Sequence, residues 1–218
     1  EIRNAINKFK IIVTKSTVPV GTGGTLDSSL DSGAGSTDLR DREPLMNAYG
    51  LDDVNEIGGP RASTRTLSYM TEMWQEKGIW DRYRADFDDR FATKPWVVRP
   101  STNPLEDYCD VYVPQQAKEY LENYDRDEPW MCWVSFGGPH EPWDTPEPYA
   151  SKYDPETMPD HIPRQDHNPD RPKGTLDDLY ERREYNFDEG EEKRLYADYA
   201  GNVHLIDQQI GEIFEAIE

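Results

Sequence analysis

His140 is the residue of this chain best placed to do chemistry. It lies in the segment PWMCWVSFGGPHEPW, residues 129–143, where an apolar run leads into a Gly-Gly-Pro turn. A protonated imidazole at such a turn can donate hydrogen bonds to an oxyanion, and a neutral one can shuttle a proton. Gly137 and Gly138 would let a ligand approach the main chain closely, while the flanking prolines restrict the backbone. A purely structural histidine is the alternative, and the bare sequence leaves it open.

A strand over residues 130–136 is expected to carry this turn and to aim His140 from its carboxyl end. Its nearly continuous apolar run predicts cover on both faces, as in a parallel or mixed sheet. A second strand is predicted at residues 9–14. The proline-rich stretch of residues 141–172 predicts a long ordered loop.

Helices are predicted at residues 64–77, at residues 114–124 with Pro114 at the start, and toward the end of the chain. In the last helix an apolar stripe recurs at alternating steps of three and four: Tyr196, Tyr199, Val203, Ile206, Ile210, Ile213 and Ile217. The pattern predicts an α/β fold, with a partial mixed or parallel sheet flanked by helices and long proline-rich loops.

The charge balance excludes some partners. The formal net charge is −20, and a surface this acidic repels phosphate backbones, so no nucleic-acid partner is expected. An anionic ligand would need a local cluster of positive charge. Residues 177–192 hold eight acids, which predicts a solvated face; calcium binding is disfavoured because the alternating spacing of a calcium loop is missing. No apolar run approaches the roughly 18 residues of a membrane helix, so no membrane partner is expected.

The remaining cysteines and histidines are weaker candidates. Cys109 and Cys132 do not make a disulfide framework. Cys132 is expected to be a small buried hydrophobe, and the acids beside Cys109 should raise its thiol pKa and weaken it as a nucleophile. His161 and His167 lie in the proline-rich loop and suit structural or solvent-facing roles, with pocket lining as the alternative. His204, one step off the apolar stripe, suits a packed or half-exposed helix position.

Three zones divide the chain. Residues 1–20 predict a helix end followed by a strand. Residues 21–37 predict a flexible linker, because twelve of the 17 are Gly, Ser or Thr. Residues 38–218 are dense in charge, aromatics and proline, as a folded domain would be. The chain lacks a signal-peptide pattern and an initiator Met, so we expect a fragment, and its start assigns no compartment.

Residues 134–149, VSFGGPHEPWDTPEPY, resemble the strand-to-loop segment of type I sulfatases, in the alkaline phosphatase superfamily. Three further stretches agree in order: residues 49–57, YGLDDVNEI; residues 153–159, YDPETMP; and residues 199–211, YAGNVHLIDQQIG. The resemblance covers roughly residues 41–218. It implies an incomplete alkaline-phosphatase-like fold.

The resemblance also implies a role for His140, as the histidine that contacts a sulfate ester near its leaving oxygen. His140 is then both the catalytic and the substrate-binding residue, because a cationic donor stabilises charge that develops there. The implied partner is a sulfate ester, carried by a small molecule or a glycan. Intact family members use a divalent cation, usually calcium, and formylglycine.

Departures from the family pattern concern the catalytic machinery. The C/S-x-P-S-R nucleophile motif does not occur in the chain, and the metal-binding aspartates, the Asp-Asn/His-Gly pair and the later lysine have no counterpart. We therefore assign no metal-binding or cofactor-binding residue, and we expect an inactive sulfuric ester hydrolase scaffold. A non-catalytic binding or interaction module on that scaffold is the alternative.

The front of the chain resembles another family. Residues 11–22, IIVTKSTVPVGT, are similar to a strand and turn of UDP-glucose/GDP-mannose dehydrogenases, where Thr17 would lie near the dinucleotide. The similarity covers about 20 residues, and the GxGxxG fingerprint is absent. An NAD-dependent UDP-sugar dehydrogenase fragment is thus a further alternative. Two families joined by a linker suggest a chimera, from a rearranged gene or an artificial joining.

Overall fold

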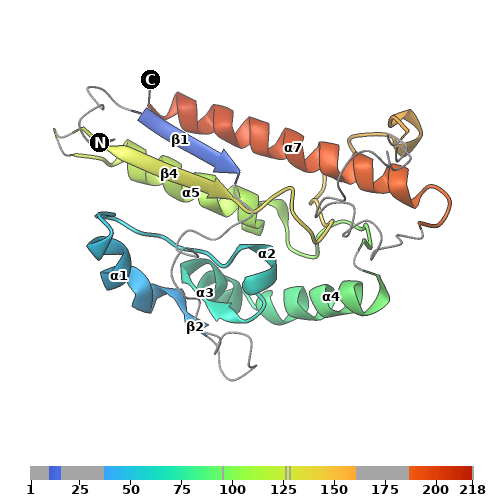
Figure 1. Ribbon diagram of the computed structural model, residues 1–218, viewed down its shortest axis with the longest axis horizontal. Helices are drawn as coiled ribbons and strands as arrows, with labels where there is room; N and C mark the ends of the chain where they lie inside the picture. The colour runs from blue at the N-terminus through green and yellow to red at the C-terminus, as the bar shows by residue number, and fades with distance from the viewer. Residues whose placement is uncertain are drawn as a thin grey trace, which may run out of the picture.

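The computed structural model describes residues 10–15, 37–94, 96–125, 127, 129–160 and 187–217. One layer contains β1 (Lys10–Lys15), α5 (Cys109–Glu122), β4 (Met131–Phe136) and α7 (Glu191–Glu215), which run side by side (Figure 1). The other contains η3 (Leu39–Arg42), α1 (Glu43–Ala48), α2 (Gly59–Ala62), α3 (Tyr69–Glu76) and α4 (Trp80–Thr93). Two further 3-10 turns are η4 (Leu105–Asp107) and η5 (Pro155–Thr157).

Both strand pairs among the described residues are parallel. β1 pairs with β4 in a register that sets Lys10 opposite Met131 and Lys15 opposite Phe136. β2 (Thr37–Asp38) pairs with β3 (Thr66–Leu67). A helix-rich chain with few, parallel strands is compatible with the predicted α/β class. The predicted linker, residues 21–37, lies outside the described residues except for its last residue, which begins β2.

β4 is covered mainly on one face, so the prediction of cover on both faces is wrong. Val134 and Phe136 are each 2% exposed, whereas Met131 and Trp133 are 43% and 44% exposed. Val134 and Phe136 pack with Ala117 and other apolar residues of α5 and α7. The alternation follows from strand geometry, because successive side chains point to opposite faces. The strand itself is confirmed to within one residue of its predicted start.

The helix predicted at residues 64–77 begins later, at Tyr69. Ser68 accepts a hydrogen bond from the amide of Thr71, and the Thr71 hydroxyl accepts one from the amide of Ser68. This reciprocal capping box satisfies amides that the first helical turn leaves unpaired, and so it sets the start. The predicted stop is confirmed, since Gly78 follows the helix with a φ of 69°.

The helix predicted at residues 114–124 starts five residues earlier, at Cys109. Pro114 lies inside α5, although proline interrupts the internal hydrogen bonding of a helix. Tertiary packing outweighs this cost, because Val111, Pro114 and Leu121 are all buried. α4 was not predicted at all, since its Asp- and Arg-rich sequence hides the buried positions Tyr83, Phe87 and Arg90.

The last helix is confirmed as α7, but its predicted buried face is right only in part: Ile206 and Ile210 are partly buried and pack against the core, beside buried Ile213. Its buried residues are Ala197, Asp198, Gly201, Asn202, Leu205, Gln209 and Ile213. Of the predicted stripe only Ile213 is buried, while Tyr199, Val203 and Ile217 are exposed. The helix turns its small and polar residues inward because the chain comes very close there: a Cβ on Gly201 would collide with the carbonyl of Tyr149.

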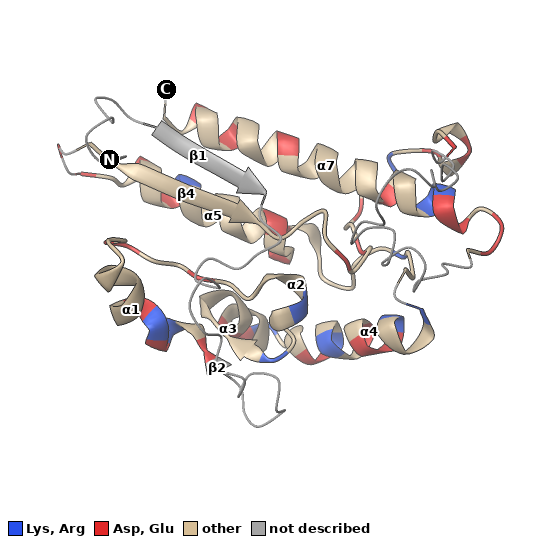
Figure 2. Cartoon of the chain, viewed as in Figure 1, with Lys and Arg blue, Asp and Glu red and all other residues tan. Residues whose placement is uncertain are grey.

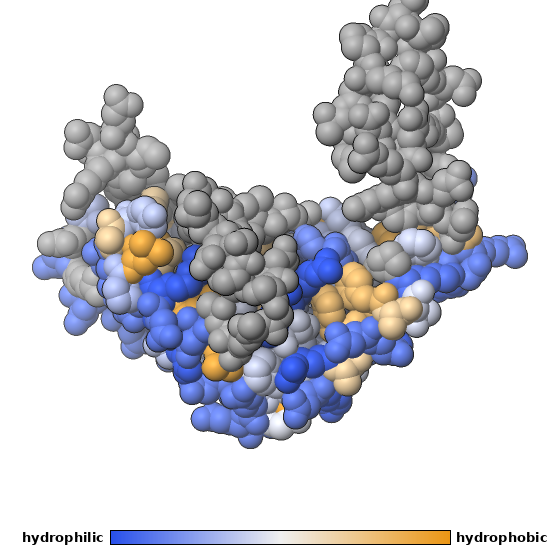
Figure 3. Space-filling model, turned by 60° about the horizontal axis from the view of Figure 1, so that its bottom comes forward, coloured by the Kyte–Doolittle hydropathy of each residue, from blue (hydrophilic) through white to orange (hydrophobic). Residues whose placement is uncertain are grey.

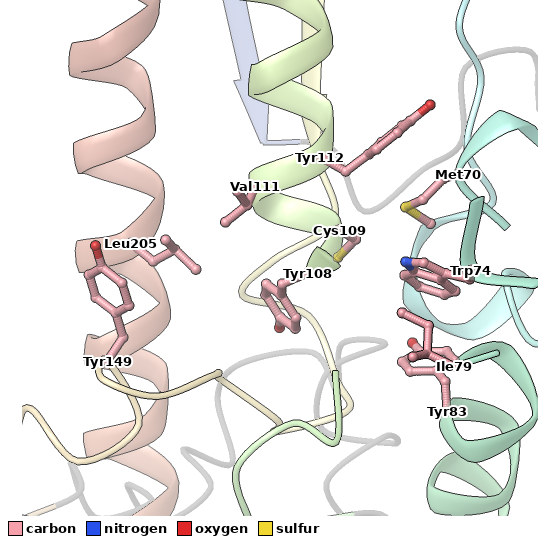
Figure 4. Close-up of a cluster of buried hydrophobic side chains, with 10 residues drawn as sticks. All are labelled: Met70, Trp74, Ile79, Tyr83, Tyr108, Cys109, Val111, Tyr112, Tyr149 and Leu205. Carbon is pink, nitrogen blue, oxygen red and sulfur yellow. The ribbon is translucent and has the colours of Figure 1, made fainter. Parts of the chain in front are cut away.

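The larger core cluster joins the two layers (Figure 4). Met70, Trp74, Ile79 and Tyr83 come from α3, α4 and the turn between them, and they face residues of α5 and α7. The Trp74 indole donates a 2.9 Å hydrogen bond to the carbonyl of Asp107, and the Tyr83 hydroxyl donates a 2.8 Å bond to that of Pro60. Full burial of such a side chain stabilises the fold by about 1.5–3 kcal/mol.

In the part of the chain that the structure describes, acidic residues are spread over α4, α5 and α7 (Figure 2). With the α1–α4 layer turned toward the viewer, the surface is largely hydrophilic and carries small apolar patches (Figure 3). Among the described residues, no helix is both long enough and apolar enough to cross a bilayer.

Candidate functional site

His140 lies four residues beyond the end of β4, with a side chain that is 33% exposed. Its Nδ1 atom is 2.9 Å from the carbonyl oxygen of Glu141 and 3.0 Å from the carboxylate of that residue. A carbonyl oxygen can only accept, so Nδ1 carries a proton. Nε2 has no hydrogen-bond partner in the part of the chain that the structure describes. The ring therefore offers Nε2 as a base when neutral and as a donor when protonated.

The backbone just before His140 is fixed by a buried carboxyl group. Asp110, in the first turn of α5, is fully buried and accepts hydrogen bonds from the amides of Gly137 at 2.7 Å and Gly138 at 2.9 Å. A side chain on Gly138 would collide with both Asp110 and Asn202, so this position requires glycine. These two amides lie beyond the end of β4 and, among the described residues, make no hydrogen bond to a neighbouring strand. A buried amide in such a position needs another acceptor.

The backbone just after His140 is fixed as well. Arg90, 1% exposed, donates a 3.1 Å hydrogen bond to the carbonyl of Trp143. The carboxylate of Asp198 on α7 accepts a 3.2 Å bond from the amide of Thr145. His140 is thus a partly exposed side chain on a segment that is tied down at both ends.

Burial raises the pKa of the carboxyl groups around this segment. The pKa of Asp144 rises to about 7 because the group is removed from water; Arg90 and a hydrogen bond from Tyr108 oppose the rise. Burial likewise raises the pKa of Asp198 to about 6, against hydrogen bonds from Thr145. The pKa of Asp110 is also raised by burial, although two backbone amides work against it.

An open cleft of about 1820 Å³ lies beside His140. It is bounded by β4, by α5 and by residues 49–57, one of the four stretches that carry the sulfatase resemblance. The structure thus brings this stretch to the same cleft as His140. The charged lining residues are Asp52, Asp53, Glu56, Arg61, Arg65 and Glu119. Among the described lining residues acids outnumber arginines, so these residues do not form the positive cluster that an anion would favour.

The other candidate residues have structural surroundings or lie outside the described residues. His204 is half-buried, with Nδ1 3.0 Å from the Tyr153 hydroxyl, which matches the packed position expected of it. His161, His167 and the dehydrogenase-like Thr17 lie outside the described residues.

Neither cysteine is suited to nucleophilic chemistry. Burial raises the pKa of the Cys109 thiol well above its ordinary value, and the neighbouring acids Asp110 and Asp144 raise it further when they are ionised. The sequence predicts this direction from the acids alone, whereas burial is the larger cause. Cys132 is only half-buried, and burial raises its thiol pKa too.

The sequence did not reveal the groups that hold the histidine. Asp110 enters the sequence argument only as an acid beside Cys109, and Asn202, Asp144 and Asp198 do not enter as site residues. The available signal was weak: the helix is predicted only from Pro114, so Asp110 lies outside it, and Asp144 lies in a predicted loop. Only the fold shows that Asp110 accepts the Gly137 and Gly138 amides and that Asp198 accepts the Thr145 amide.

The described residues do not fit the divalent cation of the family. No three His, Cys, Asp or Glu side chains among them gather at metal-binding distances. Asp110 and Asp198 each accept a backbone amide through one oxygen, and Asp144 accepts from the Tyr108 hydroxyl, so at least one oxygen of each carboxyl group is already engaged inside the protein. We therefore derive no step through a metal.

Comparison with known proteins identifies the family. The family model described as Sulfatase matches residues 62–218, which is more than half of the chain and includes α5, β4, His140 and α7. A search of curated proteins found no match. The match does not extend to residues 11–22, so the dehydrogenase resemblance stays a prediction. The chain belongs to the sulfatase family.

Proposed function

We propose that this chain forms a sulfate-ester-binding part of a sulfatase, in which His140 donates a hydrogen bond to an anionic oxygen of the ester. The ester is carried by a small molecule or a glycan. In this proposal residues 38–218 form one segment of an alkaline-phosphatase-like α/β fold. Residues 1–20 are joined to this segment through the linker of residues 21–37, and their strand β1 pairs with β4.

The observation that supports the proposal most directly is the hydrogen bonding of the His140 ring. Nδ1 is hydrogen-bonded to Glu141, while Nε2 has no hydrogen-bond partner among the described residues. The ring is partly exposed. A protonated ring held in this way presents one N–H to a ligand. Because the segment is tied down before and after His140, little conformational entropy is lost when that donor binds.

We further propose that the chain binds the ester without cleaving it. Hydrolysis requires an activated nucleophile, and the C/S-x-P-S-R motif occurs nowhere in the 218 residues. Cys109 cannot replace it, since burial raises its pKa and favours the inert thiol. The excess of acids in the cleft opposes an anion, so we expect weak binding.

A binding or interaction module that does not recognise sulfate is the second candidate. The size of the cleft supports it, because about 1820 Å³ exceeds the roughly 300–1,000 Å³ of ordinary small-molecule pockets. Its acidic lining also suits a neutral or basic partner better than an anion.

Titration with 4-nitrophenyl sulfate separates these possibilities. We expect saturable binding by the wild-type chain, with His140→Ala weakening it by about tenfold, the order of one charge-assisted hydrogen bond. His204→Ala is the matched control, because it removes a histidine whose ring nitrogen bonds Tyr153. 4-Nitrophenol, which lacks the sulfate, should not compete.

The outcomes are distinct. Equal affinity of the wild-type chain and His140→Ala would refute the assigned role of His140 and favour the second candidate. Release of 4-nitrophenol by the wild-type chain, with or without added calcium, would refute the proposed inactivity. If His140→Ala abolished that release, the chain would be an enzyme.

A further inference from the structure

The oxygen atoms of Asp110 and Asn202 pose a hydrogen-bonding problem. Asp110 Oδ2 and Asn202 Oδ1 are both buried and have no hydrogen-bond partner. Both lie so close to Gly138 that a Cβ atom there would collide with each, so they face the same small space. Two acceptors that face each other without a donor are costly in a buried site.

The neighbouring hydrogen bonds restrict the solutions. The Tyr108 hydroxyl donates its only proton to Asp144, at 3.0 Å. Asn202 Nδ2, 3.3 Å from the Tyr108 oxygen, must then donate to it, which leaves Asn202 Oδ1 directed at Asp110. If the Asn202 amide were turned over, Oδ1 would face the Tyr108 oxygen. The single hydroxyl proton of Tyr108 would then have two acceptors, Asp144 and Asn202. A proton on Asp110 resolves the conflict, because Asp110 can then donate to Asn202.

We propose that Asp110 is a positioning residue for His140 and acts as a neutral carboxylic acid. Oδ1 accepts from the amides of Gly137 and Gly138, and the proton on Oδ2 is donated to Asn202 Oδ1. This arrangement joins the start of α5, the end of β4 and the middle of α7 at one point. The backbone that leads into His140 is therefore fixed by two helices.

The electrostatic surroundings are consistent with a neutral group. Burial raises the pKa of Asp110 and favours the protonated form, although the contacts of its oxygens with the amides of Gly138 and Gly137 and with the Asn202 and Cys109 side chains work against the rise. The titratable and charged groups of this buried network are Tyr83 and Arg90 of α4, Tyr108 and Cys109 at the start of α5, Asp144, and Asp198 of α7. Arg90 is its cation, and it donates to Asp86 at 2.6 Å and favours the ionised form of Asp144.

The clearest test compares two replacements of Asp110. In Asp110→Asn, the amide oxygen can still accept from both glycine amides, and the amide NH₂ can still donate to Asn202. We expect this variant to keep the amide-exchange protection of Gly138 within about twofold of wild type. Asp110→Ala removes both functions, so we expect a loss of about tenfold or more and a shift of the His140 ring signals.

Asp107→Asn provides the matched control. Asp107 is a buried carboxylate that pairs with Lys77 and makes no hydrogen bond to residues 137–145. Its replacement should lower stability and leave the Gly138 and His140 signals in place. The carboxyl carbon of Asp110 in the wild-type chain gives an independent measurement: its titration should show that the group stays protonated above the ordinary aspartate pKa of about 3.9.

Three results would overturn the proposal: Asp110→Asn as damaging as Asp110→Ala, unchanged Gly138 and His140 signals in Asp110→Ala, or an Asp110 carboxyl that titrates at or below the ordinary aspartate pKa of about 3.9. Should Asp110→Ala fail to fold, Asp110→Asn and the carboxyl signal still decide. The inference rests on the proposed function only in that a ligand-binding role explains why His140 must be held in place. None of these measurements needs a ligand. Failure of 4-nitrophenyl sulfate to bind would refute the proposed function and leave the positioning of His140 testable.

Discussion

Replacing Asp144 by Asn should make the chain more stable at neutral pH. Asp144 is 3% exposed, and burial raises its pKa from 3.8 to about 7. Its two oxygens accept from the Tyr108 hydroxyl at 3.0 Å and from the Ser101 hydroxyl at 3.4 Å. Asn keeps an oxygen for Tyr108 and can donate to Ser101, so it imitates the protonated acid without ever ionising.

The sign and size follow from proton linkage. Between pH 4 and pH 7 the folded state holds a proton on Asp144 that the unfolded state has released. The free energy of unfolding therefore falls as the pH rises through this range: the contribution is complete below about pH 4 and lost above about pH 7. A shift of about three pKa units corresponds to about 4 kcal/mol, at 1.36 kcal/mol per unit.

Urea unfolding of the wild-type chain and Asp144→Asn from pH 4.5 to pH 8 measures this directly. The stability difference between them should be small at the acid end and should grow in favour of Asp144→Asn by several kcal/mol toward pH 8. Asp81→Asn controls for the loss of one charge, because the Asp81 side chain is 95% exposed. A difference between wild type and Asp144→Asn that stays constant with pH would refute the reasoning.

Two more predictions concern backbone packing and helix capping. Gly201→Ala should destabilise the chain by about 1–3 kcal/mol, because its Cβ would collide with the Tyr149 carbonyl, whereas Gly211→Ala on the same helix meets nothing and should stabilise by up to about 1 kcal/mol. Equal effects in thermal unfolding would contradict this contrast. Ser68→Ala should cost about 1 kcal/mol by removing the bond to the Thr71 amide, and an unchanged urea midpoint would show that the cap does not stabilise α3.

The sequence predicts elements where one local signal dominates. The apolar run of residues 130–136 predicts β4, and the periodic residues near the chain end predict α7, because burial of apolar side chains is the main force that selects these segments. Prediction from the sequence fails where tertiary contacts decide which residues are buried. The inward face of α7 follows from the close approach of Gly201 to Tyr149 and from buried Asn202, neither of which a hydropathy pattern records.

His140 could be singled out from the sequence because its setting is local: a strand, two glycines and a turn in succession. The groups that hold it could not. Asp110 lies 27 residues before Gly137, and Asn202 lies on a helix that follows a long loop. Their roles depend on hydrogen bonds between distant segments, and a single sequence carries no signal for such pairs. Their polar character even argues, wrongly, for exposed positions.

Carboxyl groups occupy this core because the backbone amides at the end of a buried strand need hydrogen-bond acceptors. The amides of Gly137 and Gly138 leave the ladder in a place that apolar side chains cannot satisfy. Asp110 supplies one oxygen for both, and it does so at low electrostatic cost only if it is neutral. The same reasoning applies to Asp144, whose replacement by Asn keeps the bonds and removes the charge. Asp110 thus holds the turn before His140, and the raised pKa values of Asp110 and Asp144 make the stability of the fold depend on pH.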